Sequence, residues 1–144
     1  MNICILIPGF IKSYKHLEYI NKLINNLEFD NVYVFGHIFK FLIKPNEKKN
    51  NIDYNNKDTC IDTDKLKLFT SYSFVDDDYK KFDDEGYDNR IYSQWYNIKK
   101  SYELYLEFSE KNNIKCEFFI RLRSEIKIKN INLFKYYIKD SYET

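Results

Sequence analysis

The segment Arg121-Leu122-Arg123-Ser124-Glu125 holds two of only three arginines in a chain that contains twenty lysines. A guanidinium is a planar fork that binds a carboxylate or phosphate through two parallel hydrogen bonds, whereas an ammonium is a hydrated point charge. Glu125 adds a carboxylate two residues after Arg123. We interpret this segment as the floor of a polar, anion-binding site. The alternative is a surface Arg-Glu cluster that only caps a strand.

Glu125 is also the residue best placed to hold a divalent metal, because hard cations prefer carboxylate oxygens and can bridge to phosphate. The alternative is an ion pair between Glu125 and Arg123. The run Asp76-Asp77-Asp78 has an Asp-x-Asp spacing suited to a hard cation, but its acidic surroundings favour a solvated charge run. His37, at the end of an apolar run, fits a structural histidine better than a catalyst. No Ser/His/Asp or Cys/His arrangement indicates nucleophilic hydrolysis.

The elements that must position these residues begin at residues 3–7, an unbroken aliphatic and β-branched run typical of a strand buried on both faces. Pro8-Gly9 ends the run, and Ser13 is a plausible N-cap for a following helix. Residues 31–37 form a second buried run. Strand, helix and strand with short connections predict a parallel βαβ unit. The apolar positions of the helix are Leu17, Ile20, Leu23, Ile24 and Leu27.

The remainder of the chain contains one long polar stretch and two further strong signals. Residues 44–89 are polar, with strand character only at 66–74, and predict a functional or mobile excursion. Residues 90–111 predict the strongest helix and residues 116–120 a third strand, while residues 131–137 could begin a helix with no evident packing partner. The helical face expected to contact the core consists of Ile91, Trp95, Ile98, Tyr102, Tyr105 and Phe108.

These elements predict a single α/β domain over residues 1–144, with a parallel or mixed sheet flanked by helices. In such sheets, ligands bind beyond the carboxyl ends of the strands, where the strand order reverses. This rule selects the loops at residues 8–13, 36–39 and 121–125. In the first, Gly9 allows a close approach of the backbone to a ligand, and Lys12 faces an anion beside the first amides of a helix. The alternative is an ordinary β-α turn, because neither GxxxxGK[ST] nor GxGxxG is present.

Alternation along the third strand predicts which side chains share a face. One side, which Glu125 joins if the alternation persists, carries Glu117, Phe119, Arg121 and Arg123. The other side, expected to face the core, carries Cys116, Phe118, Ile120 and Leu122.

Composition excludes several classes of function. With 23 basic and 22 acidic residues, the chain lacks the large positive net charge that would attract nucleic acid or an anionic membrane. The three cysteines, Cys4, Cys60 and Cys116, are far apart and lack zinc-site spacing, so we expect free, reduced thiols. No apolar run is long enough to span a bilayer, and no signal peptide is evident, so the expected location is cytoplasmic.

Taken together, these segments resemble a family of nucleotide-sugar-dependent glycosyltransferases with a GT-A-like fold, found in bacterial polysaccharide clusters and large DNA viruses. The segment Gly9-Phe10-Ile11-Lys12-Ser13-Tyr14 is similar to the family's Gly-x-x-Arg-Ser-aromatic turn, with lysine for arginine. The run Val32-Tyr33-Val34-Phe35-Gly36-His37-Ile38-Phe39 is similar to Val-Asp-Ile-Phe-x-His-aromatic, with Tyr33 for aspartate. Tyr92-Ser93-Gln94-Trp95-Tyr96 resembles a Ser-containing aromatic helix, and residues 121–125 resemble Arg-x-Arg-x-Asp, with glutamate for aspartate.

The resemblance implies a Rossmann-like, GT-A-type fold and a set of site residues. It places Glu125 as a ligand of Mn²⁺ or Mg²⁺, and Arg121 and Arg123 as phosphate or sugar contacts. Gly9 and Lys12 would lie near the nucleotide. Ser93 and Gln94 would lie near the donor pocket. The partners implied are a nucleoside-diphosphate sugar and a glycan or protein acceptor.

Family members usually continue well beyond the last motif, whereas nineteen residues follow Glu125 here, so the resemblance also implies that a C-terminal half is missing. Two other functions remain open at this point. The chain could be a non-catalytic remnant or a protein-interaction α/β module. It could also be a nucleotide-binding enzyme of different chemistry, because a fold does not fix a function.

Overall fold

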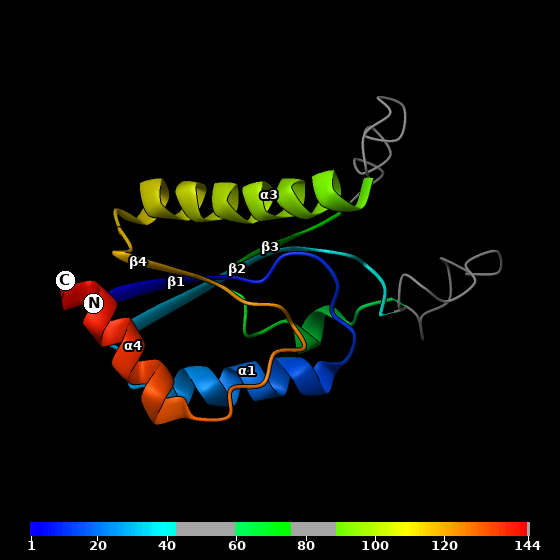
Figure 1. Cartoon of the computed structure of the whole chain (residues 1–144). Coiled ribbons are helices and arrows are strands. Elements are labelled where there is room, and N and C mark those ends of the chain that lie inside the picture. Colours follow the sequence, from blue (N-terminus) through cyan, green and yellow to red (C-terminus); the bar gives the residue numbers. More distant parts are fainter. Residues whose placement is uncertain (43–59, 76–88, 144) are drawn as a thin grey trace.

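The part of the chain that the structure describes folds around a four-stranded sheet in which every neighbouring pair of strands is parallel (Figure 1). The computed structural model describes residues 1–42, 60–75 and 89–143, with only the backbone for residues 89–93 and 141–143. The strand order is β3-β2-β1-β4. The strands are β1 (Asn2–Leu6), β2 (Asn31–Ile38), β3 (Ser71–Phe74) and β4 (Phe118–Arg121). The helices are α1 (Tyr14–Leu27), α3 (Asn89–Asn112) and α4 (Ile131–Glu143), with a 3-10 turn η2 (Thr63–Lys65).

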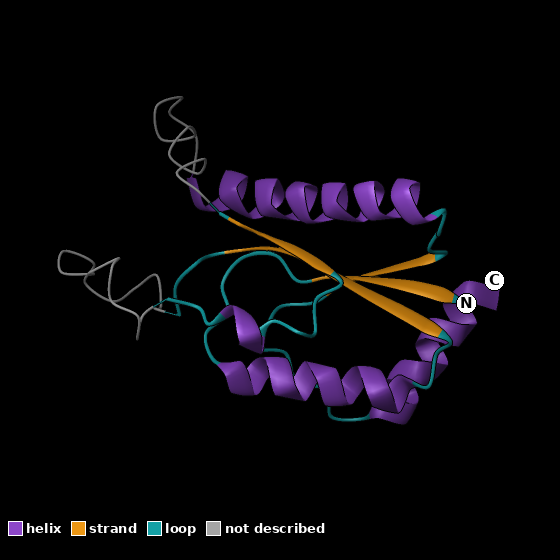
Figure 2. Ribbon diagram, turned by 180° about the vertical axis from the view of Figure 1, so that it is seen from behind, coloured by secondary structure: helices purple, strands orange, loops and turns teal. Residues whose placement is uncertain are grey.

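Helices cover both faces of this sheet, which confirms the predicted α/β class and is consistent with a Rossmann-like fold. Helix α3 lies on one face, and α1 and α4 lie on the other (Figure 1). Alternation along β1 sends Ile3 and Ile5 toward α1, and Cys4 and Leu6 toward α3. Because β1 is buried on both sides, an unbroken apolar sequence suits it. Figure 2, seen from behind, shows the strongly twisted strands between the two helical layers.

The predicted βαβ unit is confirmed at residue level. Strand β1 pairs with β2 in the register Ile3 to Val32 and Ile5 to Val34. Helix α1 begins after Ser13, whose hydroxyl accepts a hydrogen bond from the backbone N–H of Lys15 at 3.2 Å. This bond satisfies one of the N–H groups that have no partner within the helix. The buried face of α1 consists of Leu17, Ile20, Leu23 and Leu27.

The stretch 44–89, expected to be an excursion, contains a strand of the sheet. Strand β3 pairs with β2 from Phe35–Ser71 to Ile38–Phe74 and forms one edge of the sheet. Residues 66–70 precede it as a turn, so the strand is shorter than the predicted 66–74. Sequence reasoning did not foresee this pairing because a parallel partner is distant in the chain and supplies most of the stabilising contacts. Residues 43–59 and 76–88, including Asp76 to Asp78, lie outside the described residues.

The predicted core face of α3 is correct in part. Tyr105 is buried and Phe108 packs beside it, as predicted. Trp95 and Tyr102, however, are exposed, and Asn97 and Ser101 are buried in their place. The reason is hydrogen bonding: the N–H of His37 donates to the Ser101 hydroxyl at 2.8 Å, and this hydroxyl donates to the Asn97 carbonyl at 2.8 Å. A pattern of hydrophobicity alone could not identify two small polar residues as the contact surface.

Strand β4 begins two residues later than predicted. Cys116 packs on the α3 side, although alternation had placed it with Phe118, which packs on the α1 side. The chain bends at Glu117, whose N–H donates to the Asn2 carbonyl at 3.0 Å and whose carboxylate accepts from the Asn2 N–H at 2.6 Å. Regular alternation therefore starts only at Phe118. From there it holds: Leu122 is buried, and the arginines on either side of it are exposed.

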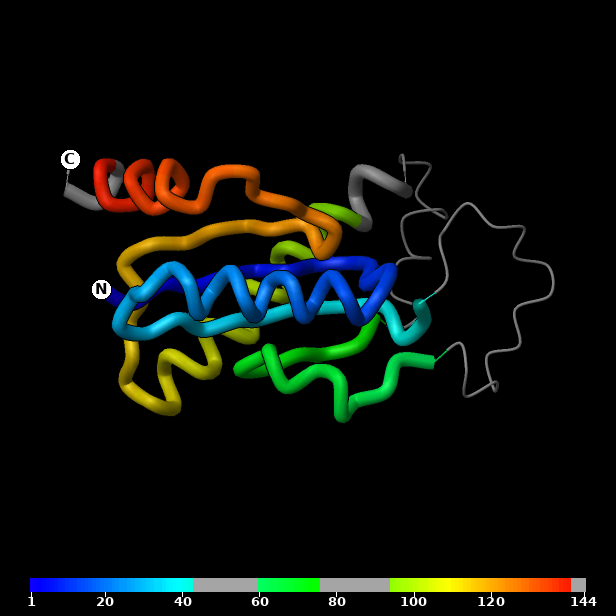
Figure 3. Tube along the Cα trace, turned by 90° about the horizontal axis from the view of Figure 1, so that it is seen from below, coloured from blue at the N-terminus to red at the C-terminus, as the bar shows by residue number. Residues whose placement is uncertain are grey.

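Helix α4 extends well past the predicted 131–137 and has a packing partner. It lies beside α1 on the same face of the sheet, on the side where β4 lies (Figure 3). Ile138 is buried in the core shared with α1. The Tyr19 hydroxyl accepts a hydrogen bond from the Ile128 N–H at 2.7 Å, which fixes the segment leading into the helix. Within the described residues, no helix combines the length and apolar character needed to cross a membrane.

The order β3-β2-β1-β4 places a topological switch point between β1 and β4. From β1 the chain moves outward through β2 to β3, and then returns to the other side of β1 to form β4. Ligands of open α/β sheets bind at such a point, beyond the carboxyl ends of the two strands. The two loops that leave this point are residues 8–13 and residues 121–125.

Candidate functional site

Lys12, Arg123 and Glu125 meet at the switch point between β1 and β4. The Lys12 ammonium lies 3.6 Å from Oε1 of Glu125, and Nη2 of Arg123 lies 3.1 Å from the same oxygen. Two of the three predicted loops, residues 8–13 and 121–125, therefore contribute to one charged cluster. Its groups are accessible, because the side chain of Glu125 is 29% exposed, that of Lys12 35% and that of Arg123 75%. The alternative ion pair between Glu125 and Arg123 is present within this larger arrangement.

A buried serine holds the two loops together beneath the charges. Ser124 is only 2% exposed, and its hydroxyl donates to the backbone carbonyl of Phe10 at 2.7 Å. The Leu122 N–H donates to the Leu6 carbonyl at 2.9 Å, which continues the strand pairing up to the cluster. These bonds fix the backbone that leads into Glu125 and tie it to the loop that carries Lys12. The side chains of Lys12 and Arg123 can therefore turn toward a ligand while the floor of the site stays in place.

Glu125 is a stable anion in this setting. Its partial burial by itself would raise the pKa of the carboxyl. Its own backbone N–H, the charges of Lys12 and Arg123, and the Ser124 hydroxyl together hold the pKa below its usual range. The site thus contains two cations around one carboxylate, with one net positive charge. Such a site suits an anionic ligand that can replace Glu125 as the partner of Lys12 and Arg123.

Gly9 affects the shape of the site, but its backbone N–H is not available to bind a ligand. Its N–H donates to the His37 carbonyl at 2.9 Å, and its carbonyl accepts from the Phe39 N–H at 3.1 Å, so its backbone groups are used in pairing with the end of β2. Its φ of 93° lies in a region that favours glycine. A side chain there would meet nothing within 4 Å. The space beside Gly9 is therefore open to a ligand.

The other residues predicted for the site are not brought into the cluster. Arg121 is exposed on the face of the sheet that α3 covers elsewhere, since its register partner Leu6 belongs to the α3-side core. It has no ion-pair partner among the described residues. Gln94 is exposed in α3. Ser93 lies in the same helix, but its side chain is outside the described residues.

His37 has the structural role that the sequence favoured. It is 4% exposed in the contact between β2, β3 and α3, and its Nδ1 lies 2.6 Å from the Ser73 hydroxyl. Ser73 and the Ser101 hydroxyl that binds its backbone were missed by sequence reasoning. The only available signal was the helical spacing of Asn97 and Ser101, which is too common to be informative.

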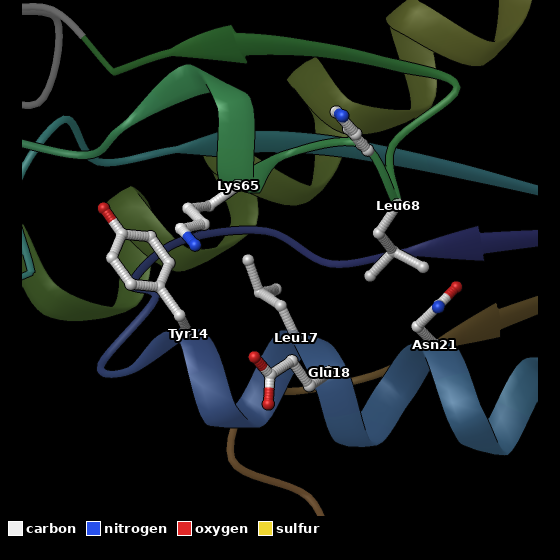
Figure 4. A pocket seen from close by; sticks show the side chains of 7 residues that line it. Tyr14, Leu17, Glu18, Asn21, Lys65 and Leu68 are labelled. Carbon is white, nitrogen blue, oxygen red and sulfur yellow. The ribbon is translucent and has the colours of Figure 1, made fainter.

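A separate pocket of about 200 Å³ lies between α1 and residues 65–68, the end of η2 and the segment after it (Figure 4). In Figure 4, Tyr14 and Leu17 extend from α1 toward Lys65. No residue of the charged cluster lines this pocket, and its volume is below the range of about 300–1,000 Å³ that is usual for drug-sized ligands. The pocket is lined by Tyr14, Leu17, Glu18, Asn21, Lys65, Lys67 and Leu68.

The cluster provides few protein ligands for a metal. Across residues 1–42, 60–75 and 89–143, no group of three or more His, Cys, Asp or Glu side chains could hold one. Glu125 is the acid at the switch point. One carboxylate fits a Mg²⁺-type ion only where substrate phosphates and water complete the coordination. The donor set therefore fits a metal that arrives with a phosphorylated ligand.

Comparison of the chain with protein-family models, with curated proteins and with solved structures gives no match. Its function therefore has to be inferred from the residues and their geometry.

Proposed function

We propose that this chain is a glycosyltransferase-like domain of GT-A type that binds a nucleoside-diphosphate sugar together with Mn²⁺ or Mg²⁺. The observation that carries this proposal is the cluster of Lys12, Arg123 and Glu125 at the switch point between β1 and β4. The family resemblance of the same segments supports it independently of the geometry.

The cations of the cluster bind the diphosphate. Arg123 offers a forked donor and Lys12 a mobile point charge, and together they match the two phosphoryl groups of such a ligand. Both cations contact Glu125 in the ligand-free chain, at 3.1 Å and 3.6 Å. Diphosphate binding transfers these contacts from the carboxylate to the phosphate oxygens. The open space beside Gly9 admits the ligand close to the backbone.

Glu125 is the residue that would hold the metal, and phosphate oxygens and water would have to complete its coordination. A bound divalent ion would supply positive charge that stabilises the departing diphosphate. Ser124 keeps this loop fixed through its bond to the Phe10 carbonyl. If the chain is active, a glycan or protein acceptor receives the sugar.

A thermal-shift screen of nucleoside diphosphates and nucleotide sugars, with and without Mn²⁺, tests the proposal. We expect stabilisation that depends on Mn²⁺ and that Arg123→Lys and Glu125→Ala each remove. Arg121→Lys is the matched control, because it makes the same change two residues away, outside the cluster, and it should leave the shift intact. If no nucleotide stabilises the chain under any metal condition, the proposal is wrong.

A second candidate function is a non-catalytic interaction module. The observation that favours it is the exposure of large apolar side chains on α3 and β4, namely Tyr102, Leu106 and Phe119. The same screen separates the two candidates, since an interaction module gives no metal-dependent response to nucleotides.

A further inference from the structure

The pocket between α1 and residues 65–68 has walls that are fixed without a ligand (Figure 4). One wall is the regular helix α1. In the other wall, the N–H of Lys65 donates to the Asp62 carbonyl at 3.0 Å, and the side chain of Leu66 is only 2% exposed. The Asp62 N–H donates to the Tyr14 hydroxyl at 2.7 Å, which ties the two walls together. The pocket is therefore preformed, as small-molecule sites usually are.

The floor of the pocket is apolar. Leu17 is 3% exposed and belongs to the main core, and Leu68 packs against the same core from the opposite wall. In Figure 4, the Tyr14 ring lies at one end of the pocket, and Asn21 lies at the other end and extends toward Leu68. An aliphatic group of a few carbons that binds here covers both leucines and is removed from water.

Charged side chains of opposite sign line the two walls. Glu18 comes from α1, and Lys65 and Lys67 come from the other wall. Both lysines and Glu18 are exposed, whereas Leu66 between the lysines is buried. None of the three charged side chains forms an ion pair with another described residue, although they share one pocket. A ligand that carries both an ammonium and a carboxylate contacts both walls at once.

The size of the pocket excludes large ligands. Its volume of about 200 Å³ is below the range of about 300–1,000 Å³ that is usual for drug-sized ligands. An inorganic anion would pair with the lysines, but Glu18 would repel it and the two leucines would stay uncovered. A purely apolar molecule would displace water from three charged groups and offer them no partner. A small amphipathic zwitterion satisfies the floor and both walls.

We propose that this pocket binds a free α-amino acid with an aliphatic side chain. The carboxylate of the ligand pairs with Lys65 and Lys67, and its ammonium pairs with Glu18. Its side chain lies on Leu17 and Leu68. No residue of the charged cluster at the switch point lines this pocket. Amino-acid binding is thus independent of the proposed nucleotide binding.

Titration of the isotope-labelled full chain, followed through its backbone amide NMR resonances, tests the proposal with leucine and three compounds that each lack one part of it. Isocaproate lacks the ammonium, isoamylamine lacks the carboxylate, and glycine lacks the side chain. Leucine should shift the resonances of residues 14–21 and 65–68 until they saturate, and each partial compound should bind more weakly. Absence of a leucine response there, equal binding of isocaproate and leucine, or an equal response to inorganic phosphate overturns the proposal.

Single charge removals test which wall binds which end of the ligand. Glu18→Gln should weaken leucine binding about twofold to fivefold, as expected for an exposed ion pair, and should not weaken isocaproate binding. Lys65→Gln should weaken the binding of leucine and isocaproate, and should not weaken that of isoamylamine. Lys22→Gln, which removes an exposed charge of α1 outside the pocket, is the matched control and should change none of these affinities. Variants that weaken all three ligands alike, or none of them, overturn the proposed binding mode.

Discussion

Replacing Glu125 by glutamine should have opposite effects on the stability of the ligand-free chain and on its affinity for a metal-free diphosphate. The change keeps the shape of the side chain and removes its charge. In the ligand-free chain it removes two ion pairs, to Lys12 at 3.6 Å and to Arg123 at 3.1 Å. Exposed pairs contribute about 0.2–1 kcal/mol each, and Arg123 is 75% exposed, so the loss should be about 0.5–1.5 kcal/mol. For a chain of this size, that lowers Tm by about 1–5 °C.

The same 0.5–1.5 kcal/mol should appear as a gain in diphosphate affinity without metal. In the parent chain the diphosphate must displace Glu125 from Lys12 and Arg123, whereas in Glu125→Gln the two cations have no carboxylate partner. We expect affinity to rise by about twofold to tenfold, since about 1.4 kcal/mol corresponds to a factor of ten. Mn²⁺ should strengthen binding to the parent and have little effect on the variant, which has lost the proposed metal ligand.

Isothermal titration calorimetry with a nucleoside diphosphate, with Mn²⁺ and with chelator, measures both effects. Glu110→Gln is the matched control, because it removes an exposed carboxylate of α3 away from the cluster, and it should change neither quantity. Weaker binding of Glu125→Gln in chelator would refute the displacement argument. An undiminished response to Mn²⁺ would refute the assignment of Glu125 as metal ligand.

The pH dependence of this stability difference follows from the sign of the pKa shift. The pKa of Glu125 is lowered in the folded chain, so its charge stabilises the fold above the pKa of the unfolded state, about 4.3. The contribution is lost as the pH falls through the lower, folded-state pKa. The Tm difference between the parent and Glu125→Gln should therefore be full at neutral pH and should close below about pH 4. A constant difference down to acid pH would show that the ion pairs are not its cause.

Two further predictions concern the packing around the sheet. Gly36→Ala should destabilise the chain by about 1–3 kcal/mol in chemical denaturation, because the new methyl group would lie 2.6 Å from the Phe69 ring and 2.7 Å from the backbone carbonyl of Ile7. A change below about 0.5 kcal/mol would contradict this packing. Alkylation of the native chain should modify the partly exposed Cys60 well before Cys4 and Cys116, because burial raises the pKa of both thiols, that of Cys116 to about 11. Comparable labelling of all three thiols without denaturant would show that the sheet is open there.

Sequence patterns predicted the central βαβ unit well because its signals are local. The apolar runs of β1 and β2 reflect burial on both faces, and Ser13 caps α1 by a bond to Lys15 within the same turn. The arginine segment was likewise recognisable from residue choice, and its buried Leu122 between two exposed arginines follows from strand alternation.

Elements that depend on distant contacts were predicted less well. Strand character was recognised at residues 66–74, but the place of β3 (Ser71–Phe74) beside β2 depends on a pairing with a strand distant in the chain. Helix α3 turns Asn97 and Ser101 toward the sheet because the His37 N–H requires a hydrogen-bond acceptor there. Nothing in the helix sequence indicates this requirement. The bend at Glu117 similarly arises from its bonds to Asn2, which is 115 residues away.

The sequence by itself determined the α/β class, the central strands and helices, and the presence of two arginines, Arg121 and Arg123, beside the carboxylate of Glu125. Local propensity and hydrophobic periodicity are sufficient for these features, because each is encoded within a few residues. Only the tertiary structure decided that Lys12 joins Arg123 and Glu125, that Arg121 does not, and that β4 lies at one end of the strand order among the described residues. These outcomes depend on strand order and register, which are set by the energy of the whole packed sheet.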